Sequence, residues 1–109
     1  PTNTPLQALV TMNDPVYLEA AMKLAMSYNH KESKTAILEM YQKATFRKVD
    51  EEKLNNLILL YEEAKLNFEN DPDQLVNFFG MDDPTDVKTA SLAIIANAIM
   101  NLDEFLTHG

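Results

Sequence analysis

Apolar residues recur along the chain at spacings of three and four, which is the period of an α-helix with one buried face. The pattern predicts five helical segments, at about 15–29, 34–46, 51–69, 72–79 and 85–106. A short leading helix is predicted from Thr4 onward. No stretch shows the strict alternation of apolar and polar residues that is typical of strands.

The segments differ in how much of their surface they bury. In 15–29 the polar residues form only the narrow stripe Glu19, Lys23 and Ser27, so we expect that helix to be buried on most sides. Each of the next two segments carries one apolar face. In 34–46 this face is Ile37, Met40, Tyr41 and Ala44; in 51–69 it is Leu54, Leu57, Ile58, Tyr61, Ala64 and Phe68.

Six capping signals mark the predicted helix starts. Thr4-Pro5-Leu6-Gln7 has the form of a capping box, and three Asp-Pro pairs follow at Asp14, Asp71 and Asp83. Ser33 and Asp50 supply the other two caps. Gly80 is suited to end the short fourth segment in a left-handed conformation.

These elements predict an all-α fold, an antiparallel helical bundle of about four main helices and two short ones. No linker-like or low-complexity stretch divides residues 1–109, so we expect one domain. Because the chain opens on Pro1 without an initiator Met, we interpret it as a C-terminal fragment of a larger multidomain protein.

Charge and composition exclude several classes of function. The net charge of -8 repels phosphate backbones and anionic membranes, which argues against nucleic-acid binding. No apolar run approaches the roughly 18–20 residues needed to span a bilayer, so no membrane insertion is expected. The absence of cysteine excludes disulfides, thiolate metal sites and covalent haem attachment within this chain.

The candidate metal and acid–base residues lack the spacing such sites require. His30 and His108 have no helical ligand partner, and the acidic clusters lack the form of a calcium loop. We therefore predict no metal site and no cofactor in this chain. Serine-nucleophile motifs and phosphate-binding loops are also absent, so the chain alone is not expected to be an enzyme.

A polar stripe on the last predicted helix is the most distinctive candidate site. Asn97, Asn101 and Glu104 recur at i, i+4 and i+7 in an otherwise apolar segment. Three interpretations are open: a solvent-facing stripe, a polar lock between helices, or a contact with another domain of the parent protein.

Two end motifs resemble a known family. The run from Thr2 to Val10, continuing through Asn13-Asp14-Pro15 to Ala21, and the closing Asn101-Leu102-Asp103-Glu104-Phe105-Leu106-Thr107 resemble the planctomycete-type cytochrome-c-associated C-terminal domain, a family of unknown function. The loop from Arg47 to Leu54 is similar to an internal turn of that family. Where the family has glycine before the arginine this chain has Phe46, and Val49 stands in place of its proline.

The resemblance implies a parent that is exported to the periplasm or cell envelope, with c-type haem carried elsewhere in that protein. The favoured interpretation is a structural or interdomain module whose partners are the upstream domains of the same chain. The alternative is that it contributes residues to a redox or hydrolytic, polysaccharide-related active site completed upstream. Asn3, Asn13, Asn97, Asn101 and Glu104 are the predicted interdomain or site residues. Substrate, reaction and oligomeric state are not predicted.

Overall fold

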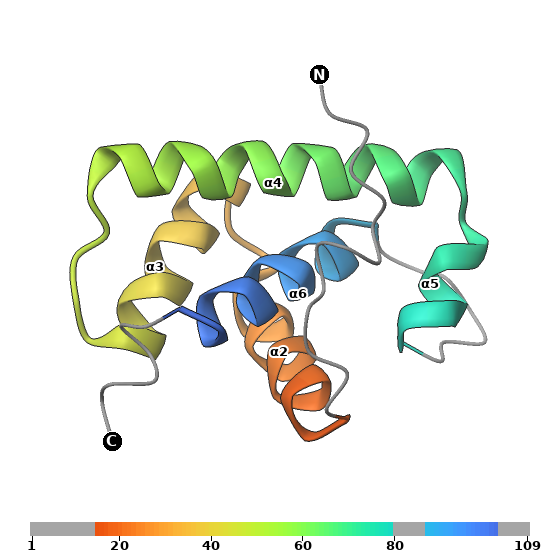
Figure 1. The fold of residues 1–109 in the computed structure, drawn as a ribbon, viewed down its shortest axis with the longest axis horizontal. Coiled ribbons are helices and arrows are strands. Elements are labelled where there is room, and N and C mark those ends of the chain that lie inside the picture. Colours follow the sequence, from red (N-terminus) through yellow and green to blue (C-terminus); the bar gives the residue numbers. More distant parts are fainter. Residues whose placement is uncertain (1–14, 80–86, 103–109) are drawn as a thin grey trace.

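The computed structural model describes the backbone of residues 15–79 and 87–102, and the side-chain surroundings of 19–76 and 87–102. Within these ranges the regular structure is entirely α-helical, which confirms the predicted all-α bundle (Figure 1). The helices are α2 (Pro15–Tyr28), α3 (Ser33–Thr45), α4 (Glu51–Asn70), α5 (Asp73–Phe79) and α6 (Val87–Met100). In Figure 1, α4 runs from left to right and α6 returns in the opposite direction.

Helix α6 lies at the centre of the fold and packs against α2, α3 and α4. It has almost no polar face, because Ala, Ile and Leu fill nearly every turn, and such a helix is stable only when other elements cover it on most sides. Its buried residues are Thr89, Ala90, Ser91, Leu92, Ala93, Ile94, Ile95, Ala96, Asn97, Ile99 and Met100. The core is therefore organised around the last of the described helices.

Two clusters of buried side chains share α6. The larger joins α6 to α2, α3 and the first half of α4, and includes Ala25, Ile37 and Leu57. The smaller joins the second half of α4 to α5 and the start of α6, through Phe68, Leu75 and Ile94. Because α6 contributes to both, it connects the two ends of the molecule.

Helix α4 follows the sequence prediction closely. It begins at Glu51, and the Asp50 carboxylate accepts a hydrogen bond from the Lys53 backbone N–H at 2.7 Å, as a capping residue should. The predicted apolar stripe faces the core, with Ile58 as its one half-buried member. The fully buried Phe68 anchors the far end of the helix.

Two predictions about α2 and α3 are wrong. Helix α2 is not buried on most sides, because Ala20 and Met26 are exposed along with Glu19, Lys23 and Ser27, and its fully buried positions Ala21 and Ala25 form one narrow face. The small alanine side chains on that face allow α6 to pack closely against α2. The buried surface of α2 is therefore narrower than predicted. Ser33 is the first residue of α3 rather than its cap; the cap position is Glu32, which makes no side-chain capping hydrogen bond.

The ends of α5 and α6 also differ from prediction. Helix α5 begins at Asp73, and Asp71 is the C-cap of α4, with its carboxylate accepting from the Gln74 side chain at 3.1 Å. Helix α6 ends at Met100, not near Leu106, because the next two backbone N–H groups bond three residues back, to the carbonyls of Ala98 and Ile99. That tighter pattern closes a helix. The predicted caps Thr4, Asp14 and Asp83, and Gly80, lie outside the described residues.

Candidate functional site

The connection between α2 and α3 is fixed onto the start of α6. The Asn29 side-chain amide donates to Thr89 Oγ1 at 3.0 Å, and the Lys88 ammonium donates to the Lys31 carbonyl. A turn bond from the Lys31 N–H to the Tyr28 carbonyl completes the corner at 3.1 Å. The two side-chain contacts join residues about sixty positions apart, and they fix the corner between α2 and α3 against α6.

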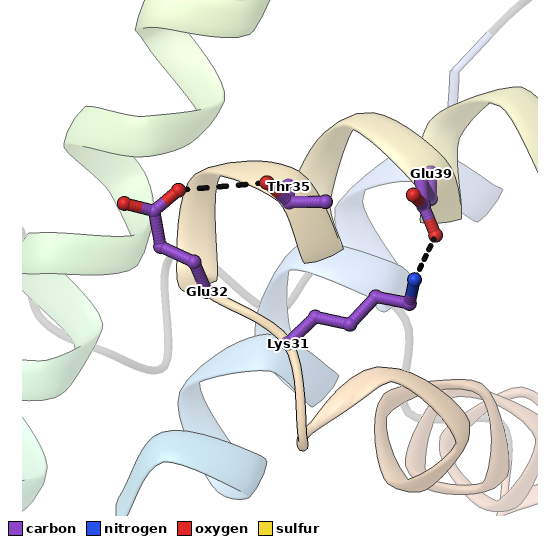
Figure 2. A network of polar contacts seen from close by, with 4 residues as sticks. All are labelled: Lys31, Glu32, Thr35 and Glu39. Carbon is purple, nitrogen blue, oxygen red and sulfur yellow. Dashed lines mark hydrogen bonds and ion pairs between the residues drawn. The ribbon is translucent and has the colours of Figure 1, made fainter.

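A small polar network covers this corner on the α3 side (Figure 2). Lys31 Nζ pairs with Glu39 Oε1 at 3.2 Å, and the Thr35 hydroxyl donates to Glu32 Oε1 at 3.4 Å. Both side chains of the ion pair are partly exposed, and such pairs contribute little to stability. The pair instead orients Glu39 along the surface of α3.

The other end of α3 closes in an unusual turn. Phe46 adopts a left-handed conformation, φ 60° and ψ 23°, and is the one non-glycine residue with positive φ among those described. The buried Thr45 hydroxyl holds the turn: it donates to the Tyr41 carbonyl at 2.8 Å and accepts from the Arg47 N–H at 3.2 Å. A residue with a β-carbon is strained in this region, by about 1–2 kcal/mol. The Phe46 side chain is nevertheless 79% exposed.

Between these two features lies a shallow, open depression of about 310 Å³. Its walls are formed by Tyr28, Glu39, Gln42, Lys43 and Phe46. These residues contribute two aromatic rings, one carboxylate, one amide and one ammonium. This set can contact a polar or aromatic group of a partner, but it holds no nucleophile paired with a base. The depression is therefore a candidate recognition surface.

The structure brings two of the predicted site residues together. The Asn101 amide donates to the Asn97 backbone carbonyl at 2.8 Å and lies 3.3 Å from Asn97 Oδ1. Asn97 is buried, with 1% of its surface exposed, so a solvent-facing stripe is wrong at this position. Its Nδ2 group has no acceptor among the described residues. Asn3, Asn13 and Glu104 lie outside the described residues, so the interdomain role of the set stays a prediction.

The remaining candidate residues can be placed only in part. His30 is exposed in the corner after α2, and His108 lies beyond the described ranges. Across residues 15–79 and 87–102 no three His, Asp or Glu side chains come close enough to hold a metal ion. Within the same ranges no helix is both long and apolar enough to cross a bilayer. The exposed surface around Phe46 was not predicted from the sequence. The sequence shows Phe46 where the family it resembles has glycine, but not which side chain the turn exposes.

Comparison with protein-family models shows which family this chain belongs to. The model of PSD1, a protein family of unknown function (DUF1553), matches residues 1–61. The chain belongs to this family. Among the curated proteins and the solved structures, nothing matches it.

The PSD1 match covers α2, α3 and the first half of α4, and it includes every residue that lines the depression. Helix α6, with Asn97 and Asn101, lies outside the matched segment. The matched helices nevertheless pack on α6, which supplies Leu92, Ile95 and Ile99 to their core. The structural unit in this chain therefore extends well past the PSD1 match.

Proposed function

We propose that this chain is the helical C-terminal module of an exported, cytochrome-c-associated protein of the cell envelope, and that it acts in structure and interdomain interaction. One observation carries the structural part: α6 is buried along nearly its whole length and completes the core of the PSD1-family helices. Its polar residue Asn97 is enclosed in that packing rather than directed at an open cavity. The association with cytochrome c rests on the sequence resemblance.

The interaction part is supported by the exposed surface. Phe46, which lines the depression, and Leu59 and Leu66 of α4 are large apolar residues that remain well exposed. Exposed apolar side chains that lie close together are typical of contact surfaces, and Leu59 and Leu66 lie along one line of α4. A covalently attached c-type haem does not fit this chain, which has no cysteine, so the haem of such a protein belongs to another domain.

The test compares this chain with a longer polypeptide that includes the preceding region of the same protein. Hydrogen exchange should show at least one face of the helical module that becomes protected in the longer polypeptide. If every amide of the module exchanges at the same rate in both, the interdomain role is wrong.

A catalytic contribution would behave differently. Substituting Asn101, Glu104, Asn3 and Asn13 by Ala in the full-length protein should leave any activity of that protein unchanged once folding is verified by circular dichroism. A loss of activity without a loss of stability would favour the alternative in which the module completes an active site.

A further inference from the structure

Helix α4 presents two leucines to solvent on the side opposite the core. The side chains of Leu59 and Leu66 are 67% and 58% exposed. They are separated by about two helical turns, or roughly 10 Å along the axis, so they lie on one line of the helix surface. In Figure 1, α3, α5 and α6 all lie on one side of α4, and its other side is the outer edge of the described fold.

The surroundings of these leucines are acidic. Glu52, Glu62 and Glu69 are exposed and Glu63 is half-buried on the same outward half of the helix, with asparagines between them. The two lysines of α4 lie elsewhere on its circumference: Lys53 reaches Tyr41 of α3, at 3.5 Å from its hydroxyl, and Lys65 is half-buried. The ion pair found among the described residues, between Lys31 and Glu39, involves none of these glutamates.

We infer that this acidic leucine face, defined by Leu59, Leu66, Glu52, Glu62 and Glu69, docks a basic amphipathic helix from the preceding region of the same polypeptide. The inference rests on the interdomain role proposed above and assigns it a surface. Two apolar residues of the incoming helix cover the leucines, and Lys or Arg on either side of them pair with the glutamates.

Charge selects this occupant over the others. A second copy of the chain would bring its own glutamates against these, and like charges placed opposite each other across an interface are destabilising. Anionic lipid is repelled for the same reason. A helix of opposite charge gains both the apolar contact and the favourable field, and it needs no rearrangement of α4.

Carbodiimide cross-linking in the longer polypeptide tests the assignment, because this reagent joins a carboxylate only to an amine in direct contact with it. Mass spectrometry is expected to find Glu62, Glu63 or Glu69 linked to lysines of the preceding region. The double variant L59Q/L66Q should reduce these links about tenfold, as loss of two central apolar contacts predicts. The control M26Q changes an equally exposed apolar residue on α2 and should leave them unchanged.

The possible results are distinguishable. Exchange protection on another face, with no links from α4, overturns this docking surface but leaves the proposed function in place. No protection anywhere overturns both. A dimer of this chain in sedimentation velocity that L59Q/L66Q dissociates also overturns the inference. If L59Q/L66Q disturbs folding, the charge reversal E62K/E69K replaces it, with E19K/E32K as its control. The reversal should repel the basic helix and reduce the links from the remaining glutamates Glu52 and Glu63 about tenfold. Links from these two glutamates at an undiminished yield would contradict the assignment.

Discussion

The Asn29 amide and the Thr89 hydroxyl are hydrogen-bonded at 3.0 Å, and this one contact ties the end of α2 to the beginning of α6. Thr89 is buried and Asn29 is half-buried, so the bond is partly shielded from competing water. The corner that carries Lys31 and the depression beside it are positioned by this contact together with the Lys88 bond to the Lys31 carbonyl.

Removing that hydrogen bond should lower the free energy of unfolding. In a double-mutant cycle of Asn29→Ala and Thr89→Val, we expect a coupling energy of about 1 kcal/mol, the usual net value of one intramolecular hydrogen bond. Urea denaturation followed by circular dichroism measures it. The nearby Ser27→Ala removes only a bond to its own helix and should change stability by less than about 0.5 kcal/mol. A coupling of zero would show that this hydrogen bond does not contribute to the stability of the chain.

Replacing Phe46 by glycine should stabilise the isolated chain. Glycine occupies the left-handed region without strain, and the exposed phenyl ring loses little burial, so we expect a gain of about 1 kcal/mol. Phe46→Ala keeps the β-carbon and should give no such gain. Thermal denaturation of the three proteins decides the matter; equal gains in both variants would mean that the ring, rather than the backbone, is the source of strain.

The close contact between α2 and α6 should not tolerate a larger residue. Ala25 is fully buried on the face of α2 that joins the core shared with α6. Ala25→Leu is expected to cost about 1–3 kcal/mol through overpacking. Ala20→Leu, on the exposed side of the same helix, should be neutral within about 0.5 kcal/mol. Comparable losses of stability in both variants would mean that α2 is rotated about its axis relative to the structure described here.

Asn97 offers a test of whether its polarity serves the folded chain. Its Nδ2 group is buried without an acceptor among the described residues, so Asn97→Leu should raise the free energy of unfolding by about 1 kcal/mol. Asn101→Ala removes the 2.8 Å bond to the Asn97 carbonyl and should lower it by a similar amount. If Asn97→Leu instead destabilises the chain strongly, the amide has a structural partner outside the described residues.

The PSD1-matched segment should not fold by itself. A fragment of residues 1–61 lacks α6, and with it the side chains that cover Ile37, Met40 and Leu57. We expect such a fragment to show no cooperative thermal transition, whereas the full chain shows one. A sharp transition in the fragment would contradict the central role assigned to α6.

Much of the fold could be predicted from local sequence signals. Asp50 and the apolar stripe of α4 gave both the start and the buried face of that helix, because capping and periodicity act within a few residues. The end of α6 and the cap of α3 could not be read in this way. Apolar periodicity continues past Met100, but the backbone closes there, and Ser33 has a capping residue's chemistry in a position one residue too late.

The candidate surfaces were harder to predict, because they depend on tertiary packing. The sequence shows that the last helix is rich in apolar residues, but it does not show that α2, α3 and α4 pack around it. Phe46 stands where the family that the sequence resembles has glycine, yet only the geometry shows that the turn is left-handed and exposes the ring. Leu59 and Leu66 become notable only once the opposite side of α4 is known to face the core.

The central place of α6 has a consequence for how the protein folds during its synthesis. Of the described helices it is the last to leave the ribosome, and its partners α2, α3 and α4 are synthesised earlier. Until α6 emerges, the apolar faces of α2, α3 and α4 have no central helix to pack against. The nascent chain is therefore expected to stay loosely packed and accessible to chaperones. Folding of the core described here therefore waits until α6 has been synthesised.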